Sequence, residues 1–284
     1  MKLVVGSANF LNDYGFNKKK TTINQIKKIF TYCKTKSINE IDTSDTYDNF
    51  TKIKGLNFSN FKINTKITFD KKKIYKADYI NSIIVKESSK LTHLNQRRYH
   101  SILIHNFYKF HTTKQLNRLN EIMNRFKNIG LTKYVGASIY STQEIKNVEK
   151  CKVLNIIQLP YNLLDRTFNP KILGKLKKKN YLIYVRSVFL QGILLKDYDN
   201  LNKKFKKFKV LKKLQKWIVD NDLSRLDVML SCIKMKKKYI DRVIVGIENL
   251  NHLKEINKSL KKKNEIFPNF IFSNYKNLID PRKW

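Results

Sequence analysis

The chain alternates between short apolar runs rich in β-branched residues and longer segments in which apolar residues recur at helical spacing. The short runs predict strands, at residues 3–8, 38–42, 61–66, 101–105, 134–138, 155–159, 182–187 and 242–246. The longer segments predict helices, at residues 22–34, 77–91, 113–128, 142–149, 170–178, 209–221, 227–235 and 251–262. Strands that alternate with helices form a parallel sheet, and this number of strands closes it. The predicted fold class is an α/β (β/α)8 TIM barrel, with residues 1–284 in one domain.

Local signals support the helices and place the loops. Thr21 or Thr22 can cap the first helix, and Pro170 suits a first helical turn, where no backbone N–H is needed. The first helix carries one apolar stripe, made of Ile23, Ile26, Ile29 and Phe30. Loop excursions are expected at residues 48–60, at 191–208, and in a C-terminal tail, 265–284, that lies over the active-site mouth.

The length and apolar content bound the class of protein. A chain of 284 residues that is 42% hydrophobic can bury one large core. No apolar run approaches the roughly 20 residues of a membrane span, and the first residues lack the apolar stretch of a signal peptide, so we expect a cytoplasmic protein. Cys33, Cys151 and Cys232 lie far apart with no metal-binding spacing, so we expect buried thiols and no metal.

The formal net charge of +37 would ordinarily suggest a nucleic acid or an anionic membrane as partner. The lysine runs, however, are spread over the whole chain instead of forming one stripe, and lysine greatly outnumbers arginine. Arginine is the residue that best makes bidentate contacts to phosphates and bases. We therefore expect no nucleic-acid and no membrane partner, and a charge that reflects coding bias.

Polar residues close three successive predicted strands. Asp42 and Tyr47 follow the second strand, Lys66 ends the third, and His105 ends the fourth. In a (β/α)8 barrel the carboxyl ends of the strands form the active-site face, so these four side chains are expected to meet there. Each residue alone has an ordinary interpretation, such as a helix cap, a packed ring or a core histidine. Their coincidence at one mouth favours a catalytic site.

At these positions the chain resembles the aldo-keto reductase family. In that family an aspartate and a tyrosine five residues apart are followed by a lysine at the end of the next strand and a histidine at the end of the one after. Further similar segments lie at residues 135–138, 157–166, 185–194 and 243–250, so the resemblance runs nearly from end to end. It implies an NAD(P)-dependent oxidoreductase that reduces an aldehyde or a ketone, with NADP(H) or NAD(H) as cofactor.

The resemblance also implies roles for the four residues. Tyr47 would donate a proton to the carbonyl oxygen, and Lys66 would lower the pKa of this phenol, which is ordinarily about 10. Asp42 would hold the lysine charged and in position. His105 would bind and orient the substrate carbonyl.

A second set of residues is implied as the cofactor site. Its members are Ser138, Gln158, Arg186, Ser187, Phe189, Gln191, Gly246, Asn249 and Glu255. Ser138 and Gln158 would hold the nicotinamide carboxamide. Arg186 stands where many members stack a tyrosine on the nicotinamide ring, and Glu255 matches a contact to the adenine.

Other departures leave the choice between NAD and NADP open. Asp48 replaces a usual glycine, and Ile139 replaces an asparagine that usually helps Ser138. Gly246 and His252 fall where NADP-preferring members often carry a lysine and an arginine.

The substrate and some alternatives stay open. Four loops are expected to shape the substrate pocket, at residues 50–58, 107–110, 189–198 and 270–284. They are rich in Phe, Tyr and Lys, which would suit an apolar wall and an anionic handle on the substrate, and a sugar-type carbonyl is the first substrate candidate. The partner is then a small molecule, and the protein a monomer or a weak homo-oligomer. One alternative is a non-catalytic, cofactor-sensing barrel that resembles the potassium-channel β subunits. Another is a nucleic-acid-associated protein, which predicts binding that falls steeply with salt.

Overall fold

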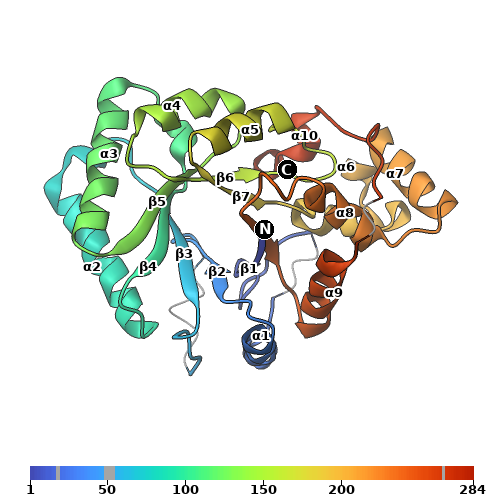
Figure 1. Cartoon of the computed structure of the whole chain (residues 1–284), viewed down its shortest axis with the longest axis horizontal. Helices are drawn as coiled ribbons and strands as arrows, with labels where there is room; N and C mark the ends of the chain where they lie inside the picture. The colour runs from blue at the N-terminus through green and yellow to red at the C-terminus, as the bar shows by residue number, and fades with distance from the viewer. Residues whose placement is uncertain (17–19, 48–54, 264–265) are drawn as a thin grey trace.

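All eight predicted strands are present and form one closed parallel barrel in the computed structural model, which describes residues 1–16, 20–47, 55–263 and 266–284 (Figure 1). The strands are β1 (Lys2–Gly6), β2 (Glu40–Asp42), β3 (Lys62–Ile67), β4 (Tyr99–Ile104), β5 (Thr132–Ser138), β6 (Ile156–Pro160), β7 (Leu182–Arg186) and β8 (Arg242–Gly246). Strand β1 pairs with both β2 and β8, which closes the ring. The predicted fold class is confirmed.

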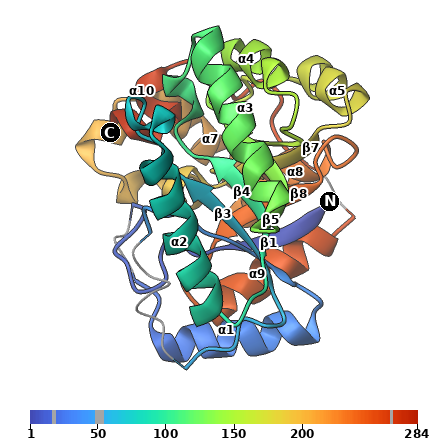
Figure 2. The same ribbon diagram turned by 90° about the vertical axis from the view of Figure 1, so that its left-hand side faces the viewer.

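Helices surround the barrel, as the two ribbon views show (Figures 1 and 2). They are α1 (Ile23–Thr35), α2 (Ala77–His93), α3 (Thr113–Asn128), α4 (Ile145–Lys150), α5 (Pro170–Lys178), α6 (Lys203–Lys206), α7 (Lys209–Asp220), α8 (Arg225–Lys234), α9 (Leu250–Lys261) and α10 (Lys276–Ile279). The helix predicted at 142–149 is instead a 3-10 turn, Thr142–Glu144, followed by α4. The loop expected at 191–208 contains short helical turns, including α6.

Helix α1 confirms the cap and corrects one residue of the apolar stripe. The Thr22 side chain accepts a hydrogen bond from the Gln25 amide and begins the helix. The buried face consists of Ile26, Ile29, Phe30 and Cys33. Ile23, the first residue of the helix, is 37% exposed and does not belong to this buried face.

Aromatic rings cover part of the barrel between β2 and β3. Residues 48–54 of the loop predicted at 48–60, and with them most of the pocket loop predicted at 50–58, lie outside the described residues. The described remainder contains no helix. There the Phe58 and Phe61 rings pack against Phe30 of α1, with ring centres 5.2 and 4.5 Å apart. These ring contacts bury apolar surface in the connection from β2 to β3, whereas helices cover the barrel in the other connections between strands.

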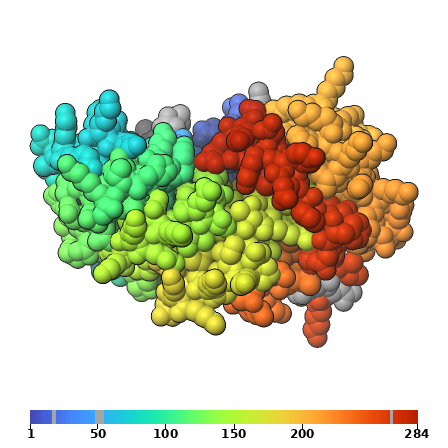
Figure 3. Space-filling model, turned by 90° about the horizontal axis from the view of Figure 1, so that it is seen from above, coloured from blue at the N-terminus to red at the C-terminus, as the bar shows by residue number. Residues whose placement is uncertain are grey.

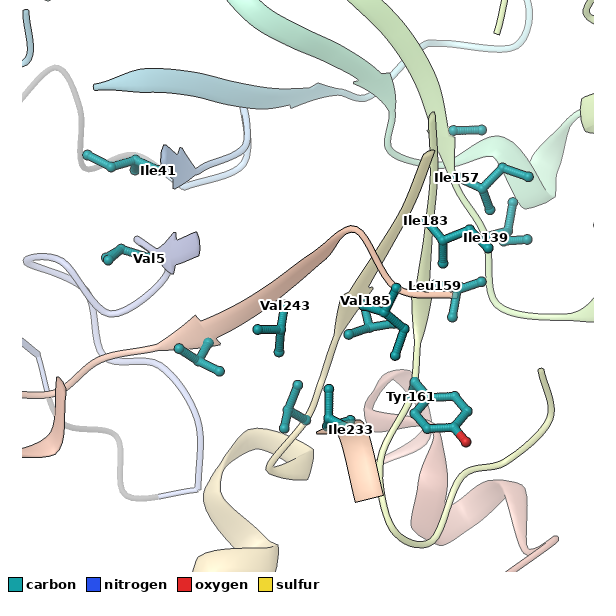
Figure 4. Packing of buried hydrophobic residues seen from close by; sticks show 14 of the residues in the cluster. Val5, Ile41, Ile139, Ile157, Leu159, Tyr161, Ile183, Val185, Ile233 and Val243 are labelled. Carbon is teal, nitrogen blue, oxygen red and sulfur yellow. The ribbon is translucent and has the colours of Figure 1, made fainter. Parts of the chain in front are cut away.

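Successive strand residues face opposite sides of the barrel wall. Val5, Ile157 and Ile183 belong to the large apolar core between strands and helices, and Figure 4 shows Ile157 and Ile183 near Ile139. A smaller apolar cluster inside the barrel is made of Val4, Leu103, Ile156, Tyr184 and Ile244. Two positions after Leu103, Ile156 and Tyr184 come the polar residues His105, Gln158 and Arg186. His105 and Arg186 line the cavity at the mouth of the barrel.

An ion pair lies at the opposite end of the strands. Arg242 at the start of β8 donates from Nε to both carboxylate oxygens of Glu40 on β2, at 2.8 and 2.9 Å. Glu40 is 1% exposed. The pair therefore joins β2 to β8 across β1 in the barrel floor.

The C-terminal segment crosses the surface of the molecule and reaches the mouth of the barrel, where the space-filling view shows it in red beside the blue N-terminal part (Figure 3). The Arg166 guanidinium donates to the backbone carbonyls of Pro268, Asn269 and Ile271 and so anchors the segment. Pro281 and Arg282 line the main cavity. Within the described part of the chain, no helix is long and apolar enough to cross a membrane.

Candidate active site

A buried ion pair forms the base of the site. Lys66 at the end of β3 donates from Nζ to Asp42 Oδ2 at 2.6 Å and to the Thr43 carbonyl oxygen at 2.6 Å. The side chains of Lys66 and Asp42 are 2% and 6% exposed. Burial lowers the pKa of Lys66, and the charge of Asp42 opposes that effect. The structure therefore pairs Asp42 with Lys66, the pairing that the resemblance implied.

Tyr47 lies above this pair in the loop that follows β2. The Lys66 Nζ atom is 5.7 Å from the centre of its ring, and the Tyr14 ring is 6.2 Å away. Burial raises the pKa of Tyr47 well above the ordinary 10.0, with Tyr14 and Asp42 adding to the rise and Arg186 opposing it. The lowering that we expected from Lys66 is therefore not found, because desolvation outweighs the cations. Tyr47 stays protonated at neutral pH.

His105 follows β4 on the other side of the pair. Its Nδ1 atom lies 3.0 Å from Ser44 Oγ and 3.4 Å from Thr68 Oγ1. Asp45 Oδ1 lies 3.9 Å from the same Nδ1 atom. The loop after β2 therefore positions both Tyr47 and His105.

One cavity of about 540 Å³ connects these groups. Asp42, Tyr47, Lys66 and His105 all line it. The structure thus brings together the four residues predicted from the strand ends. The cavity is large enough for a carbonyl substrate and part of a dinucleotide.

Most predicted cofactor residues line the same cavity. They are Arg186, Ser187, Phe189, Gln191, Gly246 and Asn249. Glu255 instead lines an adjoining cavity of about 530 Å³, which Asn249 and His252 share with the main one. The backbone is left-handed at Ser187 and Gln191, with φ of 57° and 54°. Such strain in non-glycine residues is typical of loops shaped for a ligand.

Ser138 and Gln158 lie side by side at the ends of β5 and β6, where they are partners in the strand register. They are 1% and 0% exposed. Within the described residues, neither Ser138 Oγ nor Gln158 Oε1 has a hydrogen-bond partner. Because buried polar atoms are rarely left unsatisfied, this pair fits a ligand that carries an amide.

Arg186 at the end of β7 does not lie alone. Its guanidinium stacks 4.2 Å from the centre of the Tyr140 ring and donates to the Ile139 carbonyl oxygen at 3.3 Å. Arg282 from the C-terminal segment stacks 3.4 Å from the centre of the same ring. Arg282 is also paired with Asp280, at 2.6 Å. Two guanidinium groups therefore stand at the mouth of the cavity.

Several of these residues were missed by the sequence analysis. They are Tyr14, Ser44, Asp45, Thr68, Tyr140 and Arg282. The position of Asp45, three residues after Asp42 and in the same loop, was the signal that could have drawn attention to it. All three cysteines are buried, as predicted. No group of three or more His, Cys, Asp or Glu that could hold a metal occurs within the described ranges.

The comparisons with known proteins agree with this geometry. The model of the aldo/keto reductase family matches residues 2–266, so the chain belongs to that family. The protein is therefore an oxidoreductase that acts on carbonyl compounds. No curated protein matches the sequence.

Solved structures share the fold at low sequence identity. The holo form of aldo-keto reductase AKR11C1 from Bacillus halodurans is 16% identical, with a TM-score of 0.69, over 92% of this chain and 87% of that one. The protein PA4992 from Pseudomonas aeruginosa, described as an aldo-keto reductase, is 16% identical, with a TM-score of 0.65, over 91% and 88%. Likeness at this identity supports the barrel and its closure.

Proposed function

We propose that the protein is an NAD(P)H-dependent reductase of an aldehyde or ketone in which Tyr47 is the general acid. The observation that carries this proposal is the buried Lys66–Asp42 pair at 2.6 Å, beside the Tyr47 ring and in one cavity with His105. Burying such a pair is costly, and buried ionisable groups of this kind cluster at active sites. Family membership supplies the reaction class.

The cofactor proposal rests on residues of this chain. Ser138 Oγ and Gln158 Oε1 would hold the carboxamide of a nicotinamide, since both are buried without a partner among the described residues. The loop after β7 and the start of α9, where Asn249 caps the helix, would hold the phosphates and the adenosine. When bound, the cofactor supplies the hydride.

The chain itself supplies the proton and the orientation. His105 would bind the carbonyl oxygen and hold the carbon towards the nicotinamide side of the cavity. Tyr47 would give its phenolic proton to that oxygen as negative charge develops there, and the nearby Lys66 and Arg186 would stabilise the phenolate left behind. Asp42 would keep Lys66 charged through the step.

The proposed substrate is a small, polar carbonyl compound, with a sugar-type carbonyl as the first candidate. The aromatic walls that Tyr14 and Tyr140 give the cavity suit a ring face, and Arg186 and Arg282 suit hydroxyl or anionic groups. We propose no nucleic-acid partner for this activity.

A panel assay tests the proposal. The purified protein is mixed with aldehydes, ketones and keto-sugars, and oxidation of NADH and of NADPH is followed by absorbance. Turnover of at least one carbonyl class is expected. Binding of the cofactor without turnover of any compound would contradict catalysis and favour the regulatory alternative.

A further inference from the structure

The proton positions around His105 follow from the hydroxyls that contact it. Ser44 Oγ donates to Asp45 Oδ1 at 3.1 Å, and it accepts from the Thr46 amide at 3.3 Å. The Thr46 hydroxyl also lies 3.0 Å from Ser44 Oγ. Thr68 Oγ1 also donates to Asp45 Oδ1, at 3.3 Å. Each hydroxyl has one proton, and a carboxylate is the strongest acceptor within reach of both. With both hydroxyl protons on the carboxylate, the two hydroxyl oxygens present lone pairs to His105 Nδ1, which is then the donor in both contacts.

The Asp45 carboxylate is itself firmly held. Its Oδ2 atom accepts from the Thr68 amide at 2.8 Å, and its side chain is 16% exposed. Burial alone would raise the pKa of Asp45, but the nearby His105 ring and the hydrogen bonds from Thr68 and Ser44 together outweigh burial and lower it. Asp45 is thus a fixed negative charge behind the imidazole.

We propose that Asp45 is a positioning residue that keeps a proton on Nδ1 of His105, acting through the hydroxyls of Ser44 and Thr68. In the neutral ring, Nε2 then carries a lone pair and can only accept a hydrogen bond. Nε2 gains a proton, and can donate to a carbonyl oxygen, only when the ring is an imidazolium. This inference rests on the proposed function, in which His105 binds the substrate carbonyl.

The consequence is a requirement for one proton in substrate binding. The charged and titratable groups around His105 include Tyr14, Asp42, Asp45, Tyr47, Lys66, Tyr140, Arg186 and Arg282. Of these, Asp42 and Lys66 pair with each other, and Arg282 pairs with Asp280. Asp45 is the carboxylate that stands against the imidazole.

The Asp45→Asn substitution separates this role from simple packing. The Thr68 amide keeps an oxygen at the Oδ2 position, so the new NH2 group must occupy the Oδ1 position. There it donates to the hydroxyls of Ser44 and Thr68, whose own protons turn towards His105 Nδ1. The neutral ring then carries its proton on Nε2. Asp70→Asn is the matched control, because the Asp70 carboxylate accepts from the Lys72 and Lys73 amides in an exposed loop.

The first experiment reads the tautomer directly. The two-bond 1H–15N correlations of His105 are recorded at alkaline pH in the protein without substrate. We expect the Nδ1–H tautomer in the wild type and in Asp70→Asn, and the Nε2–H tautomer in Asp45→Asn. An Nε2–H tautomer in the wild type, or the same tautomer in all three proteins, would overturn the proposal.

The second experiment reads the proton requirement through kinetics. For the wild type, kcat/KM should fall by about tenfold for each pH unit above the His105 transition, because one proton is needed. Asp45→Asn should lose this fall, since its neutral ring can donate from Nε2. An unaltered profile in Asp45→Asn would contradict the proposal. A wild type with the Nδ1–H tautomer but no turnover would support the role of Asp45 and overturn the proposed function instead.

Discussion

Gln158 donates from Nε2 to Asp42 Oδ1 at 2.9 Å, so a residue of the proposed carboxamide site directly contacts the carboxylate that holds Lys66. The two residues come from β6 and β2, on opposite parts of the barrel wall. Asp42 therefore accepts from Lys66 on one oxygen and from Gln158 on the other. One amide side chain therefore links the proposed cofactor site to the Lys66–Asp42 ion pair.

This contact predicts a defect in cofactor affinity for Gln158→Leu. The variant loses both the bond to Asp42 and the acceptor for a carboxamide. Because a hydrogen bond contributes about 1 kcal/mol, we expect the Kd for NAD(P)H to rise about five- to tenfold. Fluorescence titration measures this. The exposed Gln143→Leu is the control, and an unchanged Kd in Gln158→Leu would remove Gln158 from the site.

Lys66→Met should abolish most of the turnover. The substitution removes the buried cation beside Tyr47 and leaves Asp42 without its ion pair. General acid catalysis contributes about 100- to 10,000-fold, so a loss of kcat of that order is expected. Lys62→Met, on the exposed start of the same strand, should behave as the wild type. A pH–rate profile that is the same in Lys66→Met and the wild type would argue against coupling between Lys66 and Tyr47.

Glu40→Ala should destabilise the fold without touching the site. It leaves Arg242 without its partner in the barrel floor, and breaking such a pair costs about 3 kcal/mol. Glu149→Ala, in the more exposed pair with Lys179, should cost less than about 1 kcal/mol. Urea unfolding of both variants tests the difference. Equal losses of unfolding free energy in the two variants would mean that burial does not make the Glu40–Arg242 pair more important for stability.

The lowered pKa of Asp45 predicts how stability changes in acid. A group whose pKa is lower in the folded state stabilises the fold at every pH above its unfolded pKa, about 3.9 for Asp. That stabilisation is lost as the pH falls through the folded value. The difference in unfolding free energy between the wild type and Asp45→Asn should therefore shrink as the pH falls below about 4. A difference that grows in acid would show that the sign is wrong.

The sequence predicted the barrel because its signals are local and repeated. Alternating strands such as β8, predicted at its observed bounds, need only the period of the chain to be recognised. Asp42, Lys66 and His105 were found because strand ends converge in this fold. The contacts of Asp45 with His105, and of Arg282 with Tyr140, depend on tertiary placement of a loop and of the C-terminal segment. No spacing in the sequence encodes these contacts.

The raised pKa of Tyr47 shows the same limit for electrostatics. The residue types predicted that Lys66 would lower this pKa. The depth of burial, which the sequence does not state, decides the direction instead. The partner of each buried polar atom, such as Gln158 Oε1, is likewise a property of the folded protein.

The most direct test of the account is the activity of Tyr47→Phe, measured as carbonyl-dependent oxidation of NAD(P)H together with the cofactor Kd. The substitution removes one hydroxyl and keeps the ring that packs near Tyr14. We predict that kcat falls by at least about 100-fold while the cofactor Kd changes by less than about threefold, because the proton donor alone is lost. A variant that retains close to full turnover would contradict the assignment of Tyr47 as the general acid.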